Sequence, residues 1–482
     1  MDNISHFTIR TSDRRTFRRC LRKWDFQSSL RGNWQHIGTE QNINFWFGSA
    51  IHFSMEDYHG ENKFGDPRKA FWAYYQAFPA DELPMGAEAH YELGMAMLSY
   101  YLTWYKRHND VTGFETALVD PETHQLYNPY QVKKTDRMEY AVEQSFILPL
   151  NVWVAVDTDG KIRKAFFNEA DLPMLDLDEN GNSVVDPAGG KIYVEATHYM
   201  EYDQKGRKYL CDIVPICYHG TMDRIVCDKY GRYWILDYKT AKGADTNKLD
   251  TDDQISAYLW AFKKWFGIKP YGFIYLQLTK EAVQEPKRLK NGELSVDKKQ
   301  KTTYSLLKQE IINDYGTVNA APDKLIQFLN HMASIESPEG DRFIRWDFVK
   351  RTPEQIRSTE EHIMGELRHM LWDDLYCYPS PTRDCIWDCP CRDLCLALDR
   401  KDEIAVNEFM QNFEQRPRNE DGNLDPWREN IPWPEKLAAE GKTVPELDEI
   451  LALDECMKIE LESRASQEDT DGFKFMYGDE EE

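Results

Sequence analysis

Two runs of β-branched and aromatic residues, separated by a short glycine-containing turn, predict a β-hairpin near the middle of the chain. The runs cover residues 221–228 and 233–240. Gly231 ends the turn, where a three-residue hairpin loop needs a left-handed residue that glycine supplies without steric cost. In this register the numbers of facing residues sum to 460, so Asp223 lies opposite Asp237, with Cβ atoms roughly 5 Å apart.

A polar segment followed by an apolar stripe predicts a helix directly after this hairpin. Residues 250–253 offer N-cap oxygens and acidic first-turn side chains. Gln254 and Tyr258 are four residues apart and share one face of the helix. A second, apolar face consists of Ile255, Leu259 and Phe262.

The rest of the hydrophobic pattern mixes helical and strand character. Apolar residues at helical spacing predict helices over residues 68–108 and over most of 304–375. Residues 139–154 and 271–278 have the composition of strands. The chain is therefore expected to fold as an α/β protein.

An arginine-rich segment near the N-terminus predicts a helix with a basic surface. Ser12 and Asp13 are suited to cap a helix over residues 14–26. The apolar stripe of this helix consists of Phe17, Leu21 and Trp24. Seven cations fall within residues 10–23, namely Arg10, Arg14, Arg15, Arg18, Arg19, Arg22 and Lys23. A nucleic-acid backbone and plain solvent both suit such a helix face, and the residues alone do not decide between them.

Length and composition predict one large or two moderate domains. The chain has 482 residues, of which 41% are hydrophobic. It contains no apolar run of about 18 residues and no charged-then-apolar leader, so we expect neither a membrane span nor secretion, and place the protein in a reducing cytoplasm. Ten cysteines in that setting argue against a disulfide framework.

The net charge of −24 seems at first to exclude a nucleic-acid-binding protein. The charge is unevenly distributed, however, because residues 401–482 carry 24 acidic and only 9 basic side chains. Local patches matter more than the total for nucleic-acid binding. We therefore retain this class and expect residues 399–482 to form an acidic tail, much of it weakly ordered.

The two facing aspartates of the predicted hairpin suggest chemistry as well as structure. Asp223 and Asp237 repel each other unless a hard divalent cation takes oxygen ligands from both. Lys239 lies on the same strand face as Asp237 and is placed to act on a water molecule and on the charge of a phosphate under attack. A surface hairpin with solvated charges is the alternative.

This strand, followed by Gln254-X3-Tyr258 on a helix, resembles the PD-(D/E)XK nuclease superfamily and its RecB-like branch. The resemblance implies hydrolysis of DNA phosphodiester bonds with Mg or Mn. Lys239 would then act on the attacking water and the transition-state charge, Gln254 would orient the lysine strand, and Tyr258 would contact DNA.

Two segments upstream of the hairpin are similar to further motifs of this branch. Gly48-X3-His52-X5-Tyr58 resembles its first motif, although a lone histidine in an aromatic helix is more often a packed core residue. The resemblance implies that His52, Asp223, Asp237 and the carbonyl of Tyr238 hold the catalytic metal. Glu143, on the predicted strand 139–154, resembles an acid that often precedes the hairpin.

A cysteine cluster within residues 377–398 is the second strong chemical signal. Its members are Cys377, Cys385, Cys389, Cys391 and Cys395. Thiolates at this density suit a soft metal centre, but the paired Cys-X2-Cys knuckles of structural zinc sites are absent from the sequence.

The spacing Cys385-X3-Cys389-X5-Cys395 resembles the three-cysteine motif of RecB-like nucleases that carry a [4Fe-4S] cluster. In these nucleases an N-terminal helix supplies the fourth ligand, and Cys20 matches it. The family commonly has two residues between the first pair, and Cys377 and Cys391 are additional. Three points therefore stay open: which thiols act as ligands, whether the metal is zinc instead of an iron-sulfur cluster, and whether any metal binds.

Together these motifs predict a restriction-endonuclease-like α/β fold, with a mixed sheet flanked by helices. The nuclease domain would span residues 1–398, including a helical insertion at 60–115 and a turn-rich insertion at 155–192. By resemblance, the activity is that of an exonuclease on single-stranded DNA ends in a bacterial or phage-encoded setting, with a helicase or recombination protein as partner. A structure-selective endonuclease and a non-catalytic iron-sulfur DNA-binding or assembly factor are the alternatives.

Overall fold

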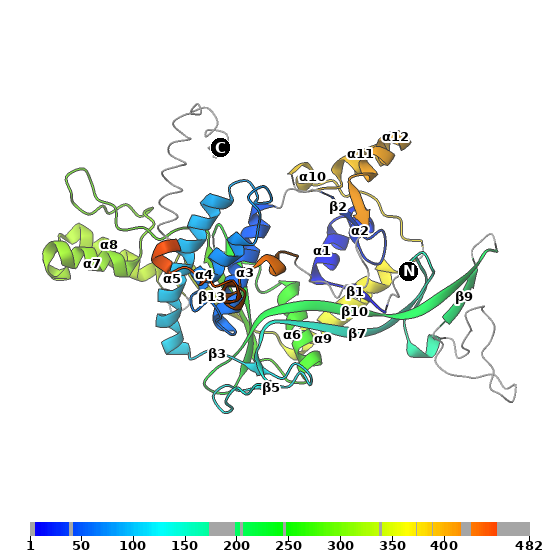
Figure 1. Ribbon diagram of the computed structural model, residues 1–482, viewed down its shortest axis with the longest axis horizontal. Helices are drawn as coiled ribbons and strands as arrows, with labels where there is room; N and C mark the ends of the chain where they lie inside the picture. The colour runs from blue at the N-terminus through cyan, green and yellow to red at the C-terminus, as the bar shows by residue number, and fades with distance from the viewer. Residues whose placement is uncertain are drawn as a thin grey trace.

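The computed structural model contains a large mixed sheet flanked by helices, consistent with the restriction-endonuclease-like fold that the sequence predicts (Figure 1). It describes residues 5–37, 42–172, 198–202, 206–243, 247–336, 340–372, 374–387, 389–415 and 426–450.

Nine strands of the described residues form the main sheet, and its central strand is the long β10. The order β13-β12-β11-β10-β7-β8 is antiparallel throughout except for the parallel pair β11 and β12, and three short strands, β1, β3 and β9, also pair with β10. The bounds are β1 Phe7–Ile9, β3 Glu115–Thr116, β7 Val142–Val156, β8 Ile162–Phe166, β9 His198–Tyr202, β10 Lys208–Cys227, β11 Tyr233–Ala241, β12 Gly272–Thr279 and β13 Ile344–Val349.

Helices cover both faces of this sheet. The face of α3 Ile43–His59, α4 Pro67–Gln76 and α5 Ala87–Thr112 buries Trp234, Leu236 and Tyr238 of β11. The opposite face, covered by α6 Asp253–Phe266 and α9 Pro353–Met370, buries Ile235 from the same strand. This alternation follows from the period-two side-chain direction of a strand. It places Asp237 and Lys239, which have the parity of Ile235, on the side of α6.

The predicted hairpin and the helix after it are confirmed. The pairs Arg224–Leu236 and Ile225–Ile235 have the expected register, and Gly231 has a φ of +79°. Helix α6 begins after Asp252, whose carboxylate caps the backbone N–H groups of Gln254 and Ile255, and Gly267 ends it in the left-handed conformation.

The single N-terminal helix that we expected over residues 14–26 is wrong, because two helices occur there. They are α1 Thr11–Arg19 and α2 Leu21–Gln27, and Cys20 between them has extended backbone angles. The predicted caps are also displaced: Arg10 is the N-cap residue, and Asp13 accepts a hydrogen bond from its backbone N–H at 2.9 Å. The break turns Cys20 out of the regular helix surface.

The mostly helical expectation for residues 304–375 missed one edge strand. Strand β13 pairs with β12 and interrupts the helices of this region, which are α7 Tyr304–Tyr315, η2 Val318–Ala320, α8 Asp323–Ile335 and α9. Helices α7 and α8 have their own small apolar core and lie at one end of the molecule (Figure 1).

The described part of the tail expected after residue 398 contains helices and a strand that pack on the rest of the protein. Strand β14 Phe413–Gln415 pairs with β2 Trp34–His36, which joins the C-terminal part to the N-terminal part. Farther on, Ile431 is fully buried in the core cluster of α3, α4 and α5. The hydrophobic residues of this segment pack despite its acidic composition. Its remaining elements are α11 Arg392–Arg400, which begins before residue 398, α12 Glu403–Met410, η3 Pro426–Asn430 and α13 Pro434–Ala439.

The predicted helical insertion contains all of α4 and α5, packed on α3. A small sheet of β4 Leu118–Val119, β5 Leu126–Tyr127 and β6 Glu139–Tyr140 follows it. The turn-rich insertion at 155–192 is described only to residue 172, through β8 and η1 Glu169–Asp171, and the rest lies outside the described residues. No helix in the part of the chain that the structure describes is long and apolar enough to cross a membrane.

Candidate metal and nuclease site

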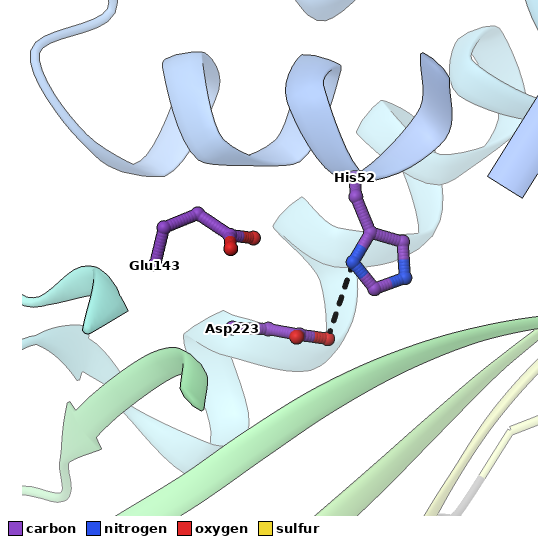
Figure 2. Close-up of side chains that lie close together, drawn as sticks. All are labelled: His52, Glu143 and Asp223. Atoms are coloured by element: carbon purple, nitrogen blue, oxygen red, sulfur yellow. Dashed lines mark ion pairs between the residues drawn. The ribbon is translucent and has the colours of Figure 1, made fainter. Parts of the chain in front are cut away.

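His52, Glu143 and Asp223 come together from three separate elements at one edge of the sheet. Their ligand atoms all lie within 4.8 Å of one another, with His52 on α3, Glu143 at the start of β7 and Asp223 on β10 (Figure 2). His52 Nδ1 is 3.4 Å from Asp223 Oδ2. One imidazole and two carboxylates are a donor set that suits Mn and also Mg.

The backbone of Glu143 is strained at this point. Its φ of +45° lies in the left-handed region that glutamate rarely adopts. The β7–β10 register pairs Met222 with Gln144, so the next step along the strands brings Glu143 beside Asp223. Burial, and then the nearby Asp223 and Glu56 carboxylates, raise the pKa of Glu143 well above its usual range. Bound cations would relieve this electrostatic cost.

The peptide of Tyr238 orients two of the three candidate ligands. Its N–H donates a 2.7 Å hydrogen bond to Asp223 Oδ2, and its carbonyl oxygen is 2.9 Å from His52 Nε2. With the proton on Nε2, the ring donates to the carbonyl, and the Nδ1 lone pair faces Asp223. The carbonyl that we expected as a metal ligand is thus engaged by His52, and its second lone pair leaves room for an ion.

The buried Asp237 and the half-buried Lys239 form an ion pair beside the three-residue group. Lys239 Nζ is 2.7 Å from Asp237 Oδ2, and the Asp237 side chain is only 2% exposed. Burial raises the pKa of Asp237 to about 6, and Asp223 adds to the effect while Lys239 opposes it. Burial by itself lowers the pKa of Lys239, but the Asp237 and Asp223 carboxylates outweigh it and raise the pKa. Lys239 is therefore a cation at neutral pH.

The two predicted residues of α6 also lie at this site. The side chain of Tyr258 is hydrogen-bonded to that of Gln254. Burial, followed by the Asp237 and Asp223 charges, raises the pKa of Tyr258. The ring of Tyr258 packs edge-on against Phe146 of β7 at 6.1 Å. Residues 52, 223, 237, 239, 254 and 258 thus all converge on one region of the sheet.

Two charged residues near the site escaped the sequence analysis. Arg224 is 2% exposed, and its guanidinium donates to Thr116 Oγ1 at 2.9 Å and to the Tyr105 hydroxyl at 3.2 Å. Glu56, one turn after His52 on α3, forms a two-bond ion pair with Arg428 at 2.7 and 3.1 Å. Glu56 follows His52 by four residues, so both lie on one face of the helix. This spacing is a sequence signal that could have identified Glu56.

Cysteines from distant parts of the chain line a common cavity. Cys20, Cys385 and Cys389 line one small cavity of about 90 Å³, between α1, α2 and the segment around α10 Asp384–Trp387. The thiol of Cys395 accepts from Arg22 Nη1 at 3.5 Å. Burial raises the pKa of Cys395, with Cys20 contributing to the rise. Cys391 is 1% exposed, and a hydrogen bond with the Cys389 side chain raises the pKa of the Cys391 thiol.

Within the described residues, no three cysteine ligand atoms lie within 4.8 Å of one another.

Much of the predicted basic patch is already ion-paired. Arg18 pairs with Asp253 and with Glu366, and Arg22 Nη1 is 2.5 Å from Asp399 Oδ1. Arg19 and Lys23 line the cysteine cavity. A DNA-binding role for these four residues stays a prediction.

The fold and this site have the features of a metal-dependent nuclease. Residues 201–396 match the family model of the PD-(D/E)XK nuclease superfamily, which indicates a nuclease. The match includes Asp223, Asp237, Lys239 and the cysteines up to 395, but ends short of His52, Glu143 and Cys20 on its N-terminal side. A search of the curated proteins finds no match.

Proposed function

We propose that this protein is a Mg- or Mn-dependent deoxyribonuclease. The observation that carries the proposal is the convergence of His52, Glu143 and Asp223 within 4.8 Å, with the Asp237–Lys239 ion pair beside them. Three converging ligands beside a half-buried cation provide both metal binding and stabilisation of negative charge.

Each residue has a role that follows from its geometry. His52 Nδ1 and the carboxylates of Asp223 and Glu143 would hold the ion. The Asp237 carboxylate would add a further negative charge beside it. The ion, when bound, supplies Lewis acidity and activates water. The Lys239 ammonium stabilises charge on the phosphate under attack, because its raised pKa keeps it protonated. Gln254 would orient the Lys239 strand, and Tyr258 would contact DNA near it.

We further propose that the enzyme is an exonuclease acting on single-stranded DNA ends. The support is the resemblance of the ordered motifs to iron-sulfur nucleases of the RecB-like branch. In a bacterial or phage-encoded setting, the enzyme would serve recombination or repair in the cytoplasm, beside a helicase or recombination protein.

A [4Fe-4S] cluster held by Cys20, Cys385, Cys389 and Cys395 is part of the proposal. The shared cavity of the first three thiols supports it, as does the Arg22 contact to the fourth. The cluster would tie the α1–α2 break to the segment after α9.

The first test is degradation of linear single-stranded DNA, labelled at either end, by anaerobically purified protein with Mn. Wild type should release nucleotides, and Lys239→Ala should lower the rate at least 100-fold. Lys264→Ala, which removes an exposed lysine of α6 whose Nζ is 2.9 Å from Glu360, is the matched control and should cut as wild type does.

Two results would replace the exonuclease assignment. Cutting of circular single strands or of branched DNA without free ends would favour a structure-selective endonuclease on the same site. Binding of DNA by cluster-containing protein with no cutting by either wild type or Lys239→Ala would favour a DNA-binding or assembly factor.

A further inference from the structure

Two adjacent tyrosines of the segment that joins α9 to α10 expose their rings to solvent. Tyr376 is 77% exposed and Tyr378 is 52% exposed. The nuclease site does not use them, since they belong to the connection between the sheet domain and the cysteines. Two exposed aromatic rings within three residues provide a flat surface that suits contact with a partner.

The backbone of this segment holds both rings on the same side. Cys377, between the tyrosines, packs against the main core, and burial raises the pKa of its thiol to about 11. Residues 375–378 alternate between half-buried and exposed, so Tyr376 and Tyr378 both lie on the solvent side of the segment. The Tyr378 carbonyl accepts a 3.2 Å hydrogen bond from the backbone N–H of Arg22. Pro379 and Pro381 restrict the chain that follows.

Cations line a cavity next to the tyrosine pair. Arg15, Arg19 and Lys23 of α1 and α2 line the cysteine cavity together with Ser380 and Thr382, which follow Tyr378 in the same segment. A second cavity, of about 650 Å³, is lined by Trp372 of the same segment and by cations as well as the acids Asp25 and Asp159, so its charge is mixed. The cations that can complement a phosphate backbone are therefore those of the cysteine cavity.

We propose that Tyr376 and Tyr378 are a stacking platform for the bases of single-stranded DNA, and that Arg19 and Lys23 bind its phosphates. The proposal deepens the proposed nuclease function and rests on it for the identity of the nucleic acid. Base faces are open to a flat ring only where a strand is not paired, so the platform selects single strands over duplex. The flanking cations provide charge complementarity to a phosphate backbone.

The test is the binding of labelled oligonucleotides, followed by fluorescence anisotropy without added metal so that no cleavage occurs. The probes are an oligothymidylate and a strand of equal length that has the phosphates but no bases. Tyr376→Ala and Tyr378→Ala should each weaken oligothymidylate binding about tenfold and leave binding of the abasic strand unchanged. Lys23→Ala should instead weaken both probes alike and reduce the dependence on salt.

The matched control is Tyr230→Ala, because Tyr230 is 71% exposed but lies on the β10–β11 hairpin turn. This variant should bind both probes as wild type does. Circular dichroism and iron content establish that each tyrosine variant is folded, which is expected because the rings are exposed.

Two outcomes would overturn the platform. The first is unchanged binding of oligothymidylate by both tyrosine variants, which would indicate that the rings bind a protein partner instead. The second is an equal loss of affinity for oligothymidylate and for the abasic strand. Because binding is read without cleavage, the platform and the nuclease assignment can fail separately: the first on these probes, and the second in the Lys239→Ala cleavage assay.

Discussion

The backbone N–H of Tyr238 donates a 2.7 Å hydrogen bond to the carboxylate of Asp223. This bond crosses the hairpin and fixes the carboxylate that faces His52. The orientation of the candidate metal ligand thus depends on strand pairing and not on a flexible side-chain neighbour. Residues that contribute to the site from outside the hairpin are the more informative targets for mutation.

Glu143→Gln should weaken Mn binding at least tenfold, because it removes one of three converging ligands while keeping the side-chain volume. It should also stabilise the metal-free protein at pH 7, because the buried Glu143 carboxylate is held close to that of Asp223. Calorimetric titration with Mn and thermal unfolding in EDTA measure the two effects. Glu139→Gln, at an exposed position of β6, is the control. Unchanged Mn affinity in Glu143→Gln would remove Glu143 from the ligand set.

Asp57 should make stability depend on pH. It is 7% exposed on α3, and burial raises its pKa to about 6 despite hydrogen bonds from the Lys63 and Phe64 backbone N–H groups. Between about pH 4 and 6 the folded state therefore keeps a proton that the unfolded state has released. The Asp57 contribution to the free energy of unfolding should fall as pH rises through this interval, by about 3 kcal/mol, and stay constant above it.

Urea unfolding of wild type and Asp57→Asn from pH 4 to pH 7 isolates this contribution as the difference between the two proteins. The exposed Asp81→Asn serves as the control, and its difference from wild type should not vary over the interval. A wild-type minus Asp57→Asn difference that is flat or rises with pH would contradict the assignment.

The segment after residue 425 should be part of the folded nuclease. Ile431 is fully buried against the helices of the site, whereas Ile404 of α12 is 82% exposed. Ile431→Ala should therefore lower the free energy of unfolding by about 2–5 kcal/mol, and Ile404→Ala by less than about 0.5 kcal/mol. Chemical denaturation compares the two variants. Small and equal losses in the free energy of unfolding of the two variants would indicate that this segment is a separate tail.

Replacement of single cysteines by serine should identify the cluster ligands. The variants of Cys20, Cys385, Cys389 and Cys395 should lose iron and sulfide, measured per chain after anaerobic purification. Cys391→Ser should retain them, because Cys391 falls outside the Cys385-X3-Cys389-X5-Cys395 spacing and its side chain is only 1% exposed. The control is Cys211→Ser, at a buried position of β10. Stoichiometric zinc, with no iron, would show that the cysteines bind zinc and not an iron-sulfur cluster.

Local patterns were sufficient for much of the site. The register of the β10–β11 hairpin, the left-handed Gly231 and the start of α6 depend on neighbours within a few residues, and the structure has all three as predicted. Lys239 beside Asp237 follows from the two-residue period of a strand. The edge strand β13 was missed because its pairing partner β12 is more than 60 residues away in the chain.

The sequence by itself determined the hairpin chemistry, the apolar faces and the presence of a cysteine cluster, because these are properties of spacing along one element. The tertiary structure alone decided that Glu143 joins His52 and Asp223, that the arginines of α1 are largely neutralised by acids of α6 and α9, and that Ile431 packs into the core. Each of these depends on contacts between segments far apart in the chain, and such contacts leave no periodic signal in the sequence.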